Sequence, residues 1–314
     1  MRALTVGTVA AIAALIVSTN TAYATHCKPS KWGPDDEIGA ANRVTPASVL
    51  AASKLIRTGK TYALGIVVDS NMPAFPPRSL NLQVVQPNQQ GGVSLFPNKL
   101  TYNDDIIQAW FGIGPQIDGL GHLGHEGVYF NCNKQEDFAA ITGLKKLGIE
   151  KIPPIVARGV LLDMAAHFGV KNLEAGPTFN AEDIKATAKK QGVEIREGDV
   201  VLFHTGWIDH VLPNDPKKWG STAPGPTEDA VEYLASKNII AAGIDTWSFD
   251  PIPPDKEGRP FQGHVILFFD GIYILEAMNT GPLAADKAYE FLFVLGQARV
   301  RGAVQMIINP VAIR

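Results

Sequence analysis

A glycine-rich stretch in the first half of the chain concentrates side chains that could do chemistry. Residues 112–127 carry an amide, a carboxylate and two imidazoles at Gln116, Asp118, His122 and His125. Glycines between them allow side chains to crowd one centre. If the stretch enters as a strand, Gln116 and Asp118 point to the same face, and His122 keeps that parity. These groups could bind a metal ion or transfer protons, whereas an ordinary surface turn is the alternative.

A second polar pair lies far along the chain in residues 263–276, where two apolar runs flank Asp270-Gly271. A hairpin with Gly271 in the left-handed bulge position would pair His264 with Glu276 on one face. A two-residue turn would instead pair Val265 with Glu276, and a helical turn in the first run is a further alternative. A buried carboxylate needs a cation or a full set of donors, which favours a joint role for His264 and Glu276.

Together the two regions offer nitrogen and oxygen ligands for one divalent ion. Such a set suits zinc or manganese, and it lacks the close cysteines of a structural zinc site. The predicted metal ligands are Gln116, Asp118, His264 and Glu276. His122 is the predicted catalytic acid and base, because imidazole titrates near neutral pH. His122 could instead bind the metal, and His125 or a second water would then carry the proton.

The first residues have the pattern of an export signal. Arg2 precedes an apolar run over residues 3–17, and Ala22-Tyr23-Ala24 offers a cleavage site. We therefore expect a signal peptide at residues 1–24 and a mature domain at residues 25–314, in the periplasm or secreted. The run is shorter than the roughly 20 residues of a membrane span, so we expect no membrane association after cleavage.

Composition narrows the possible partners and the redox state. The chain has a hydrophobic fraction of 46%, enough for a large core, and a net charge of −3, which gives no reason to expect nucleic acid. Its two cysteines, Cys27 and Cys132, should pair in an oxidising compartment. Two unpaired thiols are the alternative.

Strand signals outnumber helix signals in the rest of the chain, which predicts a strand-rich α/β fold. Caps at Thr45-Pro46 and at Asn180 begin two of the expected helices. The expected helices cover residues 46–57, 181–191 and 228–237. The expected strands cover residues 62–68, 80–86, 155–164, 199–205, 239–247, 289–297 and 303–308. The loop 87–98 has the composition of a flexible flap.

These residues resemble the cyclase family of metal-dependent hydrolases, which includes bacterial kynurenine formamidase, isatin hydrolase and trans-dienelactone hydrolase. The family motif H-x-G-T-H-x-D-x-P-x-H places its acid on Asp118 and its last histidine on His122. Its first two histidines fall on Gly112 and Gln116, and its proline falls on Leu120. The chain is closer to the longer Q-x-D-x-L-x-H version, and the missing histidines imply one metal ion rather than two.

The resemblance covers nearly the whole mature chain and implies further properties. It implies a single domain of the swivelling β/β/α type, and a homo-oligomer, dimer or tetramer, whose neighbouring chains help to line the pockets. It also implies hydrolysis of a small amide, lactam, ester or lactone by a metal-activated water. An exported protein that binds a metal or small ligand without turnover is the alternative, and its coordination sphere would be closed by protein atoms.

Overall fold

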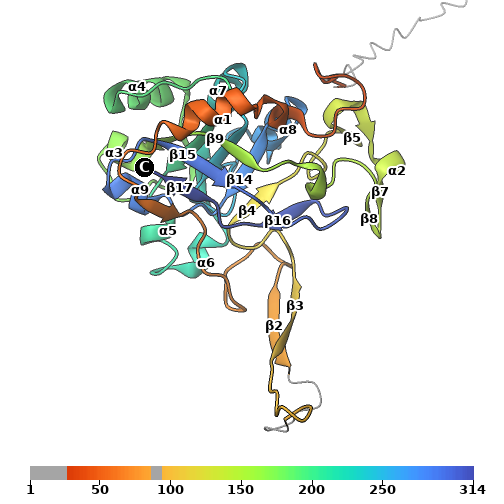
Figure 1. Ribbon diagram of the computed structural model, residues 1–314. Coiled ribbons are helices and arrows are strands. Elements are labelled where there is room, and N and C mark those ends of the chain that lie inside the picture. The colour runs from red at the N-terminus through yellow and green to blue at the C-terminus, as the bar shows by residue number, and fades with distance from the viewer. Residues whose placement is uncertain (1–26, 86–93) are drawn as a thin grey trace, which may run out of the picture.

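A computed structural model describes residues 27–85 and 94–314. One curled sheet of nine strands forms its centre (Figure 1). The strand order is β1 (Thr61–Ala63), β17 (Val311–Ile313), β15 (Glu290–Leu295), β9 (Ile155–Asp163), β11 (Val200–His204), β13 (Ala241–Ile244), β14 (Tyr273–Glu276), β4 (Gln116–Asp118) and β16 (Gln305–Ile307). This mixed architecture confirms the predicted strand-rich α/β class.

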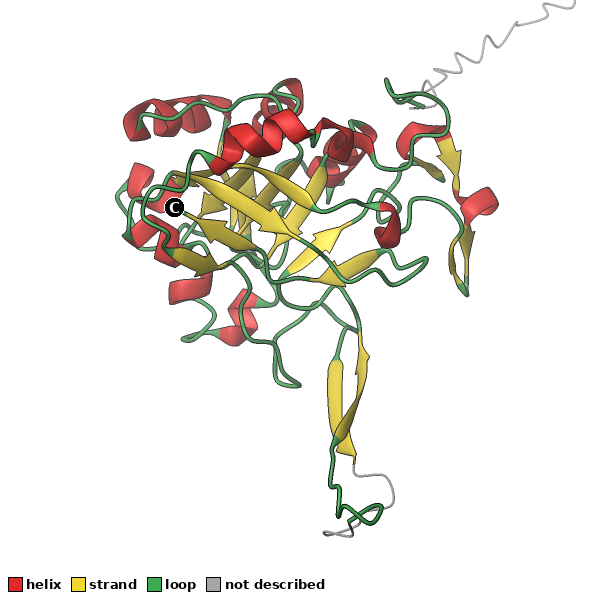
Figure 2. Ribbon diagram, viewed as in Figure 1, coloured by secondary structure: helices red, strands yellow, loops and turns green. Residues whose placement is uncertain are grey.

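The middle of the sheet is parallel, and its flanks are antiparallel. Strands β9, β11, β13 and β14 run in the same direction, and β4 pairs antiparallel with both β14 and β16. All five residues of β11 are buried, as the continuous apolar run predicts. Figure 2 shows helices on both sides of the sheet. The helices are α1 (Pro46–Ser53), α2 (Gln135–Phe138), α3 (Met164–Phe168), α4 (Ala181–Gln191), α5 (Trp207–His210), α6 (Pro216–Trp219), α7 (Glu228–Ser236), α8 (Gln262–Phe269) and α9 (Gly281–Ala285).

Short elements complete the described chain. The 3-10 helices are η1 (Gly39–Arg43), η2 (Phe130–Cys132) and η3 (Ile149–Lys151). The remaining strands are β2 (Leu80–Val85), β3 (Asp104–Ala109), β5 (Val128–Tyr129), β6 (Asn133–Lys134), β7 (Ala139–Ala140), β8 (Gly143–Leu144), β10 (Gly176–Phe179) and β12 (Pro224–Pro226). No helix in the two described ranges is long and apolar enough to cross a membrane.

Local cap signals predict the starts of α1 and α4 correctly. The Thr45 side chain accepts a hydrogen bond from the backbone of Ser48 at the start of α1. Asn180 and Asp183 form a reciprocal capping box at the start of α4. These contacts are encoded within one turn of chain, so the sequence alone reveals them.

The predicted hairpin over residues 263–276 is wrong, and the helical alternative for its first run is correct. Residues 262–269 form α8, and Asp270-Gly271 leads directly into β14. The Asp250 carboxylate accepts hydrogen bonds from the backbone N–H groups of Gly263 and His264, at 2.6 and 3.1 Å. This cap satisfies donors at the helix start from a distant part of the sequence.

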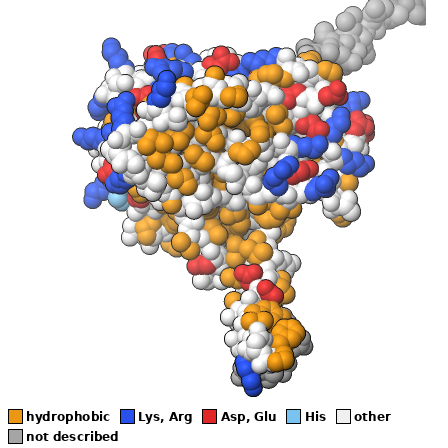
Figure 3. Space-filling model, viewed as in Figure 1, with side chains coloured by type: hydrophobic (Ala, Val, Ile, Leu, Met, Phe, Trp, Pro, Cys, Tyr) orange, Lys and Arg blue, Asp and Glu red, His pale blue; other side chains and the backbone are white. Residues whose placement is uncertain are grey.

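A two-stranded arm formed by β2 and β3 projects from the body on the side away from α1, α4 and α7 (Figure 1). Apolar side chains remain exposed on it, among them Leu82 at 57%, Val84 at 67% and Ile107 at 60%. Figure 3 shows hydrophobic side chains on the arm and on the adjoining face of the body. The flap predicted at residues 87–98 falls mostly in the gap 86–93, outside the described residues.

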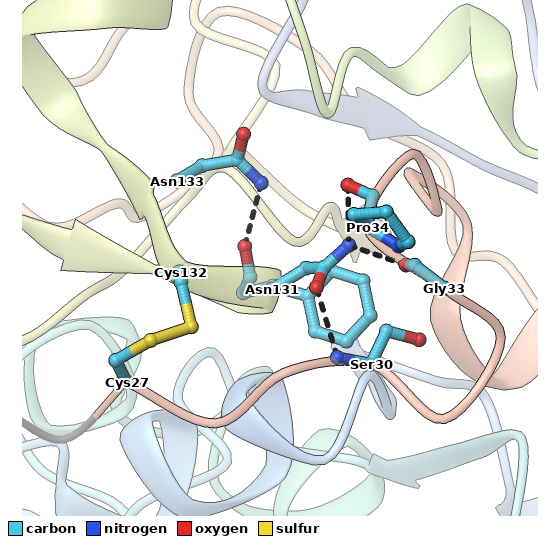
Figure 4. The surroundings of a disulfide bond; sticks show 8 residues. Cys27, Ser30, Gly33, Pro34, Asn131, Cys132 and Asn133 are labelled. Carbon is cyan, nitrogen blue, oxygen red and sulfur yellow. Dashed lines mark hydrogen bonds between the residues drawn. A yellow bond between two sulfur atoms is a disulfide. The ribbon is translucent and has the colours of Figure 1, made fainter.

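A disulfide ties the first described residue to η2. Cys27 bonds to Cys132, as predicted (Figure 4). Beside the disulfide, the Asn131 side chain accepts a hydrogen bond from the Ser30 backbone and donates to three carbonyl oxygens of the N-terminal segment. The segment after Cys27 is therefore fixed to the loop that follows the glycine-rich stretch. The predicted signal peptide lies outside the described residues.

Candidate metal and active site

Strand register brings the two polar regions of the sequence together. Gln116 and Asp118 lie on one face of β4, and Glu276 of β14 pairs with Gln116. The Gln116 Nε2 donates to Glu276 Oε2 at 2.6 Å and to Asp118 Oδ1 at 3.3 Å. All three side chains are buried. The amide of Gln116 thus faces the carboxylates as a donor and holds them in place.

His264 lies in the first turn of α8 and joins this group with one ring nitrogen. Its Nδ1 lies 2.5 Å from Asp250 Oδ2, and its Nε2 lies 3.4 Å from both Asp118 Oδ2 and Glu276 Oε1. A carboxylate that accepts the Nδ1 proton leaves Nε2 free to bind a metal. Asp250 therefore orients His264 toward Asp118 and Glu276.

His122 closes the cluster on its more accessible side. Its Nε2 lies 3.9 Å from Asp118 Oδ2, and its side chain is 19% exposed, whereas that of Asp118 is fully buried. Burial lowers the pKa of His122 to about 4, against the opposing charge of Asp118. The imidazole is therefore neutral at pH 7 and can accept a proton or bind a metal.

The cluster fits a divalent cation. The potential ligand atoms of Asp118, His122 and His264 all lie within 4.8 Å of one another. Ligands about 2.0–2.1 Å from a tetrahedral zinc are roughly 3.3 Å apart, close to the separations of His264 Nε2 from the two carboxylates. Asp118 Oδ2 is buried and has no hydrogen-bond partner among the described residues. A cation would satisfy that oxygen.

The electrostatics of the cluster also favour a positive charge at its centre. Burial and the negative charge of Asp118 raise the pKa of Glu276. Burial lowers the pKa of His264, but the carboxylates of Asp118, Asp250 and Glu276 close to its ring outweigh it and raise this pKa well above its usual value. When both imidazoles are neutral, nothing in the cluster balances the negative charge of its carboxylates.

Three residues near the cluster were not predicted from the sequence. Gln305 of β16 pairs with Asp118, and its Nε2 donates to Asp118 Oδ1 at 2.6 Å. Asp250 orients His264, and the charge of Arg78 acts on His122. Asp250 follows a short loop after β13 and precedes a proline, and neither feature signals a role in the cluster.

His125 lies outside the cluster. Its backbone forms a bridge with Val128, and its side chain is 43% exposed, with Nε2 at 4.0 Å from Glu126. It is not in the group of close ligand atoms formed by the described residues. The structure therefore does not bring His125 together with the other predicted site residues.

A cavity of about 770 Å³ lies beside the base of the arm. Gln305 lines it, as do the aromatic side chains of Trp110 and Phe111. Since Gln305 also binds Asp118, this cavity adjoins the cluster.

Comparisons with known proteins agree with this architecture. The family model described as "Putative cyclase" matches residues 62–251, a range that includes Asp118 and His122 and ends before His264 and Glu276. Isatin hydrolase of Roseibium aggregatum is 33% identical over 125 residues, which cover 38% of this chain and 47% of the relative. The match thus spans about half the length of that curated relative.

Solved structures resemble most of the chain. The crystal structure of a novel cyclase aligns with a TM-score of 0.81 and 29% identity, covering 91% of this chain and 98% of the other. The structure of a predicted metal-dependent hydrolase from Bacillus stearothermophilus aligns with a TM-score of 0.53 and 19% identity, covering 82% and 98%. At that identity the second likeness supports the fold alone.

Proposed function

This chain belongs to the cyclase family, and from that premise we propose that it is a metal-dependent hydrolase of small amides, lactams, esters or lactones. The observation that carries the proposal is the buried Asp118 Oδ2, which has no hydrogen-bond partner among the described residues and faces the Nε2 atoms of His122 and His264. The likeness to isatin hydrolase favours a cyclic amide as the substrate.

Side chains of the cluster would bind the metal ion. Asp118 and His264 would hold a zinc or manganese ion, with Glu276 as a further carboxylate beside them and Gln116 fixing that carboxylate. When bound, such an ion lowers the pKa of a coordinated water and polarises a carbonyl group.

His122 would then transfer the proton. As water adds to the carbonyl carbon, a C–O bond forms and the Nε2 of His122 takes the water proton. Its neutral state at pH 7 suits that step. When the C–N or C–O bond of the substrate breaks, His122 returns the proton to the leaving nitrogen or oxygen. The products are a carboxylic acid and an amine or alcohol.

The test combines metal analysis with a hydrolysis screen. Purified protein should contain about one divalent ion per chain and open isatin-like lactams, N-formyl aromatic amines or lactones, with loss of activity on chelation and recovery on zinc or manganese addition. Asp118→Asn should lose metal and activity, whereas Asp105→Asn on the exposed arm should keep both. Chelator-insensitive hydrolysis would refute the metal mechanism, and a metal-loaded protein that hydrolyses none of these compounds would indicate binding without turnover.

We further propose that the protein is exported to the periplasm or secreted. The Cys27–Cys132 disulfide supports this, because such bonds persist mainly in oxidising compartments. Cell fractionation and N-terminal sequencing test it, with Thr25 as the expected first residue of the mature chain. A cytosolic protein that keeps its first 24 residues would contradict it.

We also propose that the arm joins copies of the chain into a dimer or tetramer. Exposed Leu82, Val84 and Ile107 support this, because apolar side chains clustered on a projecting strand pair favour association. Light scattering after size exclusion should show an oligomer for the wild type and for the control Val67→Asp. Ile107→Asp should shift the protein toward the monomer, and a monomeric wild type would contradict the proposal.

A further inference from the structure

Arg78 carries a charge that the described residues leave without a counter-ion. It is half-buried, two residues before β2, and its Nη1 donates to the carbonyl oxygen of Gly112 at 2.6 Å. Within residues 27–85 and 94–314, no carboxylate forms an ion pair with it. By contrast, Arg43, Arg158 and Arg259 each pair with an acid.

The guanidinium lies beside the metal cluster. A Cβ atom added at Gly112 would lie 2.7 Å from Arg78 Nη1 and 2.7 Å from Gln305 Oε1, so these two side chains converge on the glycine. Gln305 in turn donates to Asp118 Oδ1 at 2.6 Å. Arg78 is therefore one side chain removed from Asp118, and its charge also acts on His122.

Among the described residues, no acid of the cluster forms an ion pair with Arg78, and two of these acids are engaged by other groups. Glu276 accepts hydrogen bonds from Gln116 and from the Phe249 backbone, and Asp250 caps α8 and holds His264. A guanidinium has five N–H donors in a planar fork that matches a carboxylate, and the contact with Gly112 uses one of these donors. A ligand can therefore supply the missing anion.

We propose that Arg78 is the residue that binds an anionic group of the substrate, and that the preferred substrates carry a carboxylate near the bond that is cleaved. This inference rests on the proposed hydrolase function and deepens it. Gly112 is needed for this placement of Arg78, because any larger side chain there would displace the guanidinium from its position beside Gln305.

A binding experiment tests the proposal without any turnover. Benzoate and its neutral isostere nitrobenzene are titrated into the protein by calorimetry, with and without added zinc. The wild type should bind benzoate more tightly, and Arg78→Gln should weaken benzoate binding by about 10–100-fold, the range expected for a hydrogen bond to a charged group. Nitrobenzene binding should change little. The control Arg57→Gln, on an exposed arginine after α1, should bind both as the wild type does.

A second variant and a second readout separate recognition from folding. Arg78→Lys keeps the charge and should retain benzoate binding better than Arg78→Gln. With active enzyme, the ratio of kcat/KM for 2-formamidobenzoate over formanilide should fall about 10–100-fold in Arg78→Gln. Equal loss of benzoate and nitrobenzene, or unchanged benzoate binding in both variants, would overturn the proposal. Failure to hydrolyse either formyl compound would count against the hydrolase function and leave the binding result decisive for Arg78.

Discussion

Asp250→Asn should weaken metal binding although Asp250 itself is not a predicted ligand. Its carboxylate accepts three hydrogen bonds, from His264 Nδ1 at 2.5 Å and from the backbones of Gly263 and His264 at 2.6 and 3.1 Å. An asparagine keeps the size but removes the charge that holds the Nδ1 proton. Loss of such a partner typically costs 10–100-fold in metal affinity, or about 1.4–2.7 kcal/mol.

The assay is competition for zinc against a chromophoric chelator at pH 7, with the melting temperature of the metal-free protein measured in parallel. Asp255→Asn is the matched control, since Asp255 Oδ2 accepts from the Glu228 backbone at 2.9 Å at the start of α7. Both variants keep one acceptor oxygen at the start of their helix and should change the melting temperature by similar, small amounts, and only Asp250→Asn should lose zinc affinity. Equal zinc affinity in Asp250→Asn and wild type would refute the assigned role of Asp250.

Four further predictions follow from the same geometry. His122→Ala should keep the metal and lose at least about 100-fold in kcat, because general acid–base groups contribute about that much; metal analysis and rates on one sample decide this, and loss of the ion would make His122 a ligand. In the metal-free protein, burial lowers the pKa of His122 from 6.5 to about 4, so between these pH values the unfolded chain binds more protons than the folded chain. The free energy of unfolding should therefore fall by up to about 3 kcal/mol as the pH drops through this interval. Urea unfolding at pH 7 and 4.5 should show a smaller fall for His122→Gln than for the wild type. Gln305→Leu removes the donor to Asp118 Oδ1 and should weaken zinc affinity about tenfold in the same chelator competition. Replacing both Cys27 and Cys132 by serine opens a link across 105 positions and should lower the free energy of unfolding by about 2–4 kcal/mol in urea, whereas an unchanged midpoint would show that the bond does not contribute.

Features encoded locally are those that the sequence predicts well. Alternation along β4 places Gln116 and Asp118 on one face, as the strand parity predicts. The capping box at Asn180 identifies the start of α4 because donor and acceptor lie within one turn. The continuous apolar run of β11 indicates burial on both faces for the same reason.

Residues 263–276 show where local reasoning fails. Their apolar runs and Asp-Gly turn are typical of a hairpin, yet a carboxylate 13 positions before Gly263 caps the first run as a helix. His264 still meets Glu276, because the helix start and the end of β14 lie at the same edge of the sheet. The prediction that His264 and Glu276 act together therefore does not depend on the prediction of a hairpin.

The residues that surround the cluster could not be predicted from the sequence for a different reason. Gln305 is 187 positions from Asp118, and their contact depends on β16 pairing with the far side of β4. Arg78 acts near the cluster only because Gly112 leaves room for its guanidinium. Neither Gln305 nor Arg78 lies at a sequence distance from the glycine-rich stretch that would identify it. Only the folded structure shows that these two residues lie near the cluster.

The charges of the cluster explain why this arrangement is costly without a cation. Asp118, Asp250 and Glu276 are buried around one imidazole, and burial of unpaired charge is strongly unfavourable. The surrounding carboxylates raise the pKa of His264 and so favour a proton there, which supplies one positive charge. Even so, Asp118 Oδ2 has no hydrogen-bond partner in the described part of the chain. A divalent ion between Asp118 and His264 would supply two charges and satisfy that oxygen at once, in place of the proton. A divalent ion would therefore offset the negative charge of this cluster more fully than a proton on His264 does.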